Sequence, residues 1–174
     1  AIVFHLAAQS QVLPSYRDPL ETFAVNLLGT AHVLAGACEA PSVRGVLVVT
    51  TDKVYENAEA GGRFCERDPL GGHDPYSASK AGAEMIAASW RRSFAAHRVP
   101  PVAIATARAG NAIGGGDWAP DRLLPDCMRA FSAHRPVRLR QPASERPWQH
   151  VLDPLAGYLA LAARLMGDHV ADCH

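Results

Sequence analysis

The stretch "RGVLVVTTDKVYE", residues 44–56, constrains the fold more than any other part of the sequence. Its first half is a run of aliphatic residues, which is typical of a strand buried on both faces of a parallel sheet. Its second half turns polar at Thr51, Asp52 and Lys53. Open α/β sheets bind their ligands at the carboxyl ends of their strands. The stretch therefore predicts both a core strand and a site at its end.

Strands and helices are predicted to alternate on both sides of this stretch. Apolar runs predict strands at 2–8, 45–50 and 102–109. Helical spacing predicts one helix from Asp18-Pro19 to about Ala40 and another over 75–94. The remaining predicted elements are a polar loop at 56–74, a short helix at 125–133, a short strand at 137–140 and a final helix at 154–166. Short apolar strands joined by helices indicate an α/β fold with a doubly wound parallel sheet.

Composition argues against several classes of partner. The 174 residues carry 17 basic and 17 acidic side chains, a net charge of +0, so nothing points to nucleic acid or a membrane surface. No apolar run is long enough to span a membrane. The four cysteines are scattered without a CxxC spacing, which favours a reduced, cytoplasmic protein. The histidines show no HxxxH or HExxH spacing, so no metal site is predicted.

The motif "YSASK", residues 76–80, places Tyr76 and Lys80 one turn apart on one face of a predicted helix. A tyrosine acting as a base near pH 7 must lose about three units from its usual pKa of about 10, which costs roughly 4 kcal/mol. A lysine about 4 Å away supplies roughly 4 kcal/mol at an effective dielectric near 20. The alternative, a packed Tyr76 and a solvated Lys80, is the more common meaning of an isolated YxxxK.

The combination of YxxxK with a threonine at a preceding strand end resembles the active site of the short-chain dehydrogenase/reductase superfamily. "FHLAAQ" (4–9), Asn26 and "RPWQHV" (146–151) resemble its extended branch, which works on nucleotide sugars. Within that branch the chain resembles the CDP-glucose 4,6-dehydratase family over roughly residues 3–166. The segments that carry this closer resemblance are "TDKVYEN", "DPYSASK", "ARAGNAIGGGDWAPDRLLPD" and "RPWQHVLDPLAGYL".

The resemblance implies an NAD-dependent enzyme that oxidises C4 of the sugar, eliminates water across C5 and C6, and returns the hydride to C6. Tyr76 would be the base at the 4-hydroxyl, supported by Lys80, and Thr51 would hydrogen-bond the 4-oxygen. Asp52 would be the acid at the 6-hydroxyl. Lys53 would act either as base or as a charge that stabilises the enolate, and the sequence leaves both roles open.

Further site residues follow from the same resemblance. Related dehydratases carry Glu where this chain has Lys53, so this lysine favours the CDP-glucose branch. A plain surface pair of Asp52 and Lys53 is disfavoured, because adjacent strand residues point to opposite faces. The cofactor-binding residues would be Leu6, Ala7, Ala8, Tyr76 and Lys80. The residues facing the diphosphate of CDP-glucose would be Asn111, Arg122 and Arg146.

Two features are ambiguous. Asn26 is equally consistent with a satisfied polar group inside a helix and with a support for the cofactor site. "GNAIGGGDW", residues 110–118, suggests a phosphate-binding loop but lacks the GK[ST] ending. We interpret it as a substrate loop.

The chain opens directly on "AIVFHLAA" and shows no Gly-rich cofactor fingerprint, so we expect a central fragment. Residues 1–112 would be part of a Rossmann-type NAD domain that lacks its first strands, and 113–174 a truncated substrate-binding region. The activity would belong to the full-length parent, for which the resemblance allows a homodimer, and the fragment alone would be inactive. The alternatives are another nucleotide-sugar epimerase or dehydratase, and a non-catalytic remnant that binds a nucleotide or a partner through the sheet edge.

Overall fold

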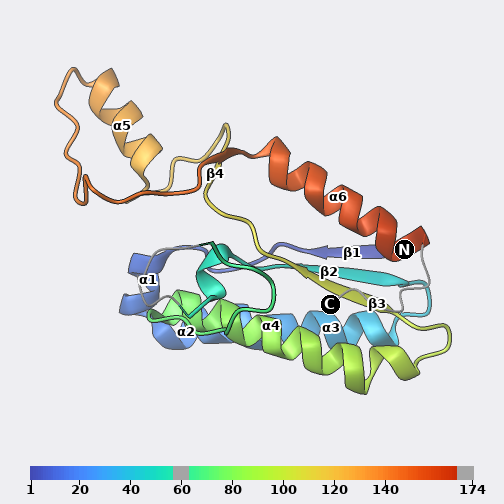
Figure 1. The fold of residues 1–174 in the computed structure, drawn as a ribbon. Coiled ribbons are helices and arrows are strands. Elements are labelled where there is room, and N and C mark those ends of the chain that lie inside the picture. Colours follow the sequence, from blue (N-terminus) through green and yellow to red (C-terminus); the bar gives the residue numbers. More distant parts are fainter. Residues whose placement is uncertain (57–62, 168–174) are drawn as a thin grey trace.

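A three-stranded parallel sheet forms the centre of the computed structural model, which describes residues 1–56 and 63–167 (Figure 1). Its strands, in spatial order, are β1 (Ile2–His5), β2 (Gly45–Val49) and β3 (Ala103–Ala107). Each pair runs parallel, with Val46 opposite both Val3 and Ile104. All three are shorter than predicted at their carboxyl ends, where the chain turns into the polar segments of the candidate site.

Helices cover both faces of the sheet, so the predicted α/β, doubly wound class is confirmed (Figure 1). One face carries α3 (Gly29–Glu39) and α4 (Pro75–Ser93), and the other carries α6 (Leu152–Gly167). The core under α3 and α4 comprises Leu34, Ala37, Val43, Val46, Val48, Ala87, Ala95, Val102 and Ile104. The core under α6 comprises Leu47, Ala105 and Leu165. Neighbouring residues of β2 thus face opposite layers, as a pleated strand requires.

The first long helical segment is divided where a single helix was predicted. It contains α2 (Pro19–Phe23), the π-helical turn η1 (Ala24–Leu28) and α3, in unbroken succession. Asp18 begins it as predicted, because its carboxylate accepts a 2.9 Å hydrogen bond from the backbone N–H of Glu21. The short helix α1 (Val12–Arg17) precedes it and was not predicted.

The chain leaves the sheet after β3 and returns with α6. The excursion contains β4 (Ala112–Ile113), α5 (Leu123–Ser132) and β5 (Gln149–His150), and β4 pairs with β5. Figure 1 shows α5 standing well away from the sheet. The strand predicted at 137–140 is wrong: this segment alternates apolar and basic residues, but within residues 1–56 and 63–167 no strand pairs with it. Of the polar loop predicted at 56–74, residues 57–62 lie outside the described part.

Two short 3₁₀ turns, η2 (Asp52–Val54) and η3 (Ala95–His97), complete the described elements. Within residues 1–56 and 63–167, no helix combines the length and the apolar character needed to cross a membrane.

Gly72 packs directly against the first turns of α4, and we expect its replacement by alanine to destabilise the complete protein. Its φ is +118°, and a Cβ would lie 2.5 Å from the backbone nitrogen of Ala78. The strained backbone predicts a loss of about 2 kcal/mol or more in the free energy of unfolding, measured by urea denaturation. Gly36→Ala is the matched control: nothing lies within 4 Å of its Cβ position, and removing a helical glycine should stabilise by about 0.5–1 kcal/mol. Equal effects of the two substitutions would contradict this.

Candidate active site

The carboxyl end of β2 leads directly into Thr51, Asp52 and Lys53, the predicted catalytic tripeptide. Asp52 and Lys53 are not adjacent strand residues, as the case against a surface pair assumed: β2 ends at Val49 and both residues lie in η2. Thr51 caps this turn: its hydroxyl accepts a 3.4 Å hydrogen bond from the N–H of Lys53 and donates a 3.1 Å bond to the Asp52 carboxylate. Thr51 is buried, Asp52 is half-buried and Lys53 is exposed. The turn therefore presents a threonine and a carboxylate together, with the lysine set apart.

Helix α4 begins at the motif that carries the predicted base. Asp74 caps the helix, its carboxylate accepting hydrogen bonds from the N–H (3.0 Å) and the hydroxyl (2.6 Å) of Ser77. The backbone N–H of Tyr76 donates to the hydroxyl of the buried Ser15 at 3.2 Å. Tyr76 and Lys80 are only 8% and 6% exposed, so neither is a solvated helix residue. The sequence alternative of a solvated Lys80 is excluded.

Lys80 reaches from α4 to the end of the sheet. Its Nζ donates a 3.0 Å hydrogen bond to the carbonyl of Val49, the last residue of β2. Burial lowers the pKa of Lys80 to about 8, although the nearby Glu84 carboxylate favours the charged form. His5, at the end of β1, has its pKa lowered by burial and then by the Lys80 charge. The lysine thus sits between two strand ends.

The phenol of Tyr76 faces the tripeptide. Burial raises its pKa, while its hydrogen bond with Thr51 lowers it, the Asp52 charge raises it and the Arg122 charge lowers it. The net direction of the pKa shift is upward, opposite to the lowering that the spacing of Tyr76 and Lys80 predicted. The reason is physical: desolvation of a buried phenolate is the largest of these effects.

A buried carboxylate that the sequence analysis missed, Glu84, lies one turn beyond Lys80 on α4. Thr50 donates to its Oε1, and Thr106 donates to its Oε2 at 2.8 Å. Arg108 binds both oxygens, with Nε 3.1 Å from Oε1 and Nη2 3.0 Å from Oε2. Burial raises the pKa of Glu84, but the hydrogen bonds from Arg108, Thr50 and Thr106 outweigh it and hold the pKa below its usual value. One carboxylate thus ties α4 to the ends of β2 and β3.

Arg108 in turn supports the loop that follows η2. Its guanidinium lies 4.9 Å from the ring centroid of Tyr55, in cation–π contact, and donates to the Glu66 carbonyl at 3.3 Å. The Tyr55 ring stacks on Phe64 with 4.7 Å between centroids. The only sequence signal for this network was the spacing of Tyr76, Lys80 and Glu84, four residues apart each time.

The segment after β1 holds the predicted cofactor-binding residues. Leu6 and Ala7 are exposed and Ala8 is half-buried. Asn26, buried in η1, fixes the next residue: its amide oxygen accepts from the N–H of Gln9 at 2.8 Å, and its Nδ2 donates to the Gln9 carbonyl at 2.9 Å. Nδ2 also donates to the Ser79 hydroxyl of α4 at 2.9 Å. Asn26 is therefore a satisfied polar group that also connects this segment to the helix of Tyr76.

A pocket of about 330 Å³ opens beside Asp52. Its walls are Asp52, Gly110, Pro147, Trp148 and Gln149. The backbone carbonyl of Asn111 accepts a 3.0 Å hydrogen bond from the N–H of Gln149, which holds the returning segment against the end of β3. The pocket therefore lies between Asp52 of the predicted catalytic tripeptide and two of the predicted substrate-binding segments.

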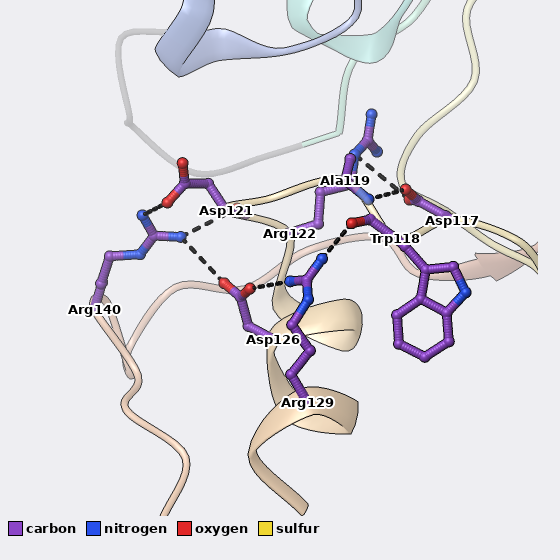
Figure 2. Close-up of polar contacts among 8 residues, drawn as sticks. All are labelled: Asp117, Trp118, Ala119, Asp121, Arg122, Asp126, Arg129 and Arg140. Carbon is purple, nitrogen blue, oxygen red and sulfur yellow. Dashed lines mark hydrogen bonds and ion pairs between the residues drawn. The ribbon is translucent and has the colours of Figure 1, made fainter. Parts of the chain in front are cut away.

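The two predicted arginines are placed differently. Arg122 Nη2 donates to the Ser10 hydroxyl at 3.3 Å. Figure 2 shows its other contact, in which Nε lies 3.5 Å from the Asp117 carboxylate. Arg122 therefore lies near the carboxyl ends of the strands, where its charge acts on Tyr76. Arg146 is exposed, and its guanidinium donates to the adjacent Glu145 carbonyl at 2.6 Å. The structure therefore brings Arg122 to the site but not the Arg146 side chain.

No group of three or more His, Cys, Asp or Glu side chains among the described residues is arranged to hold a metal ion. The chemistry that the assembled groups can perform is proton transfer by Tyr76 and Asp52, with Thr51 as hydrogen-bond partner and Lys80 as a neighbouring cation.

Comparisons with known proteins agree along almost the whole chain. The model of the NAD dependent epimerase/dehydratase family matches residues 1–170. A CDP-glucose 4,6-dehydratase of Salmonella typhimurium is 48% identical over 167 residues, covering 94% of this chain and 46% of that protein. A dTDP-glucose 4,6-dehydratase of Streptomyces griseus is 31% identical, covering 93% of this chain and 47% of that protein.

A solved structure shows the same arrangement of elements. The dTDP-glucose 4,6-dehydratase DesIV of Streptomyces venezuelae, crystallised with NAD and TYD bound, matches with a TM-score of 0.81 at 28% identity. The match covers 93% of this chain and 48% of that one. The chain thus spans about half the length of the relatives it matches.

Replacing Lys80 by methionine should make the complete protein more stable at pH 7. The pKa of Lys80 falls from 10.5 to about 8 on folding, so the folded state disfavours its proton and the penalty disappears as pH rises from about 8 to 10.5. Relief of that penalty, less the lost hydrogen bond to Val49, predicts a gain of about 2 kcal/mol. Urea denaturation at pH 7 and pH 10 should show the gain shrinking at the higher pH. The exposed Lys53→Met is the control, and a less stable Lys80→Met would contradict the prediction.

Replacing Glu84 by glutamine should cost about 3 kcal/mol of unfolding free energy at pH 7, since it leaves Arg108 without its charged partner. The lowered pKa of Glu84 means that its contribution is complete above the usual value of 4.5 and is lost as pH falls through the folded pKa. Denaturation at pH 7 and below pH 4 should therefore show the two proteins converging in acid. The exposed Glu145→Gln should change neither value, and an equal loss there would refute a specific role.

Proposed function

We propose a function on the premise that the chain belongs to the NAD dependent epimerase/dehydratase family. The complete protein is a nucleotide-sugar 4,6-dehydratase that converts CDP-glucose to its 4-keto-6-deoxy derivative with NAD. One observation carries the proposal: Thr51, Asp52, Tyr76 and Lys80 meet at one edge of the sheet. The 48% identity to a CDP-glucose 4,6-dehydratase over 94% of the chain supports the choice of substrate.

The residues at the end of β1 fit the cofactor. Leu6 and Ala7 leave exposed surface next to a segment that Asn26 holds in place, and the buried Lys80, whose charge acts on His5 at the end of β1, supplies a donor. Leu6, Ala7 and Ala8 would line the cofactor, with Tyr76 and Lys80 beside it. NAD, when bound, supplies the acceptor for the hydride from C4 and its donor to C6.

Tyr76 takes the proton of the 4-hydroxyl in this proposal. Its burial is unfavourable to the phenolate, so the groups that oppose this effect matter: the Thr51 hydroxyl and the Arg122 charge. Lys80 remains mostly protonated at pH 7, because its pKa of about 8 lies above neutrality. The site therefore keeps a positive charge on the helix of Tyr76. Thr51 hydrogen-bonds the 4-oxygen as it becomes a carbonyl.

Asp52 delivers a proton to the departing 6-hydroxyl. Its position on the wall of the 330 Å³ pocket, facing Gly110 and the returning segment, leaves room for a sugar carbon beside the carboxyl group. A lysine acts as a base when burial favours its neutral form. Lys53 is exposed, so in this proposal its charge stabilises the enolate formed at C5, and the C5 proton passes to solvent water.

Arg122 and Asn111 would face the diphosphate, and Arg146 would have to turn from the Glu145 carbonyl to join them. Arginine suits this task because its planar fork matches two phosphate oxygens. The division into domains at 112, the cytoplasmic location and the homodimer stay predictions.

The complete protein should convert CDP-glucose, with NAD, to a product lighter by one water, and should prefer it to dTDP-glucose and UDP-glucose. Mass spectrometry of the product follows the reaction. Deuterium placed at C4 should appear at C6, because the hydride is returned within the same molecule. Epimerisation at C4 without loss of water would favour an epimerase instead. Nucleotide binding without turnover would favour a non-catalytic protein.

Tyr76→Phe serves as the internal check of this assignment. Removing the phenol should lower the rate of C4 oxidation at least about a hundredfold, because general-base catalysis supplies at least that factor. Tyr16→Phe is the matched control, since that ring is 63% exposed. Retention of the wild-type rate by Tyr76→Phe would refute the base role.

A further inference from the structure

Asp121 has an unusual backbone conformation immediately before a substrate-facing residue. Its φ is +63°, in the left-handed region that a residue with a side chain rarely adopts, and the next residue is Arg122. Aspartate tolerates this region better than most residues, but something must hold it there.

Arg140 binds Asp121 at two points. Its Nη1 donates to the Asp121 carboxylate at 2.7 Å, and its Nη2 donates to the backbone carbonyl of the same residue at 3.1 Å (Figure 2). A planar guanidinium can make both bonds at once, so it fixes the side chain relative to the peptide group. We call these two bonds the Arg140 fork.

The fork is anchored to α5. Nη2 of Arg140 lies 3.7 Å from the Asp126 carboxylate, which also accepts a 2.8 Å hydrogen bond from Arg129. Arg129 donates in addition to the carbonyl of Trp118 in the preceding loop. Figure 2 shows these side chains linking the loop, the start of the helix and the segment around Arg140. Arg140 therefore holds the peptide group between Asp121 and Arg122, and Asp126 of α5 holds Arg140.

Arg122 is where this excursion reaches the sheet. Its Nη2 donates to Ser10, which lies two residues after the proposed cofactor-binding residues 6–8, and its Nε pairs with Asp117 at 3.5 Å. Asp117 is itself oriented by the backbone N–H of Ala119, which donates to it at 3.1 Å. The side chain of Arg122 is thus supported by Asp117, and its backbone by the Arg140 fork.

We propose that Arg140, acting through Asp121, is a positioning residue that aims Arg122 at the diphosphate of the nucleotide sugar. The inference rests on the proposed function. Without the fork, Asp121 relaxes toward negative φ, and the chain direction into Arg122 and α5 changes with it. Arg140 makes no contact with the reacting groups, so its loss weakens binding and leaves the chemical step unchanged.

The test compares Arg140→Ala and Arg140→Lys with the matched control Arg138→Ala, two residues away in the same exposed segment. The probe is CDP alone, bound to the complete protein in a titration calorimeter, followed by KM and kcat with CDP-glucose. We expect both Arg140 variants to raise Kd and KM by about tenfold with kcat within about twofold, since uniform binding is lost. Lysine should not rescue, because it keeps the charge but not the fork.

A double variant isolates the route of the effect. If Arg140 acts through Arg122, Arg122→Ala/Arg140→Ala should bind CDP no more weakly than Arg122→Ala alone. Additive losses, rescue by Arg140→Lys, or an Arg140→Ala that matches Arg138→Ala would each overturn the positioning role. These results leave the proposed function intact. A wild-type protein that binds none of CDP, dTDP and UDP would overturn both.

Discussion

The carboxylate of Glu84 is the interaction on which the geometry of the site depends. Apolar packing between α4 and the sheet is non-directional, so it holds the helix close without defining its register along the strands. Glu84 supplies that definition, because Thr50 at the end of β2 and Thr106 and Arg108 at the end of β3 all donate to one buried carboxylate. Removing a charge from water is costly, and the two-point contact with Arg108 offsets the cost. The position of Tyr76 relative to Thr51 follows from this register.

The same arrangement explains why a buried lysine is tolerated. Lys80 lies one turn before Glu84, and the carboxylate favours the charged form that burial disfavours. Tyr76, Lys80 and Glu84 share one face of α4, so the helix presents the proposed proton acceptor, a cation and its counter-ion at successive turns. Under the proposed function, the site needs a cation at Lys80 although its burial is destabilising, a conflict between stability and activity that is common at functional sites.

Local signals in the sequence predicted most of the fold. The apolar runs of β1, β2 and β3, and the Asp-Pro pairs that begin α2 and α4, are recognisable without knowledge of their neighbours. The errors arose where pairing decides. Residues 137–140 alternate like a strand but pair with no strand among the described residues, whereas the two-residue β4 and β5 pair across the excursion. Glu84 was missed for a similar reason. A glutamate on a helix is expected to be solvated, and its burial becomes evident only from its ion pair with Arg108, which follows β3.

The two halves of the site are held by forces of different strength. Tyr76, Lys80 and Thr51 lie in a buried network in which hydrogen bonds are protected from water. Arg122, by contrast, is positioned by Asp117 and by the Arg140 fork, whose members are roughly half exposed. Exposed ion pairs are individually weak and are screened by salt. Under the proposed function, the groups for proton transfer are therefore rigid while the contact with the diphosphate is adjustable, so ionic strength should act on substrate binding far more than on the chemical step.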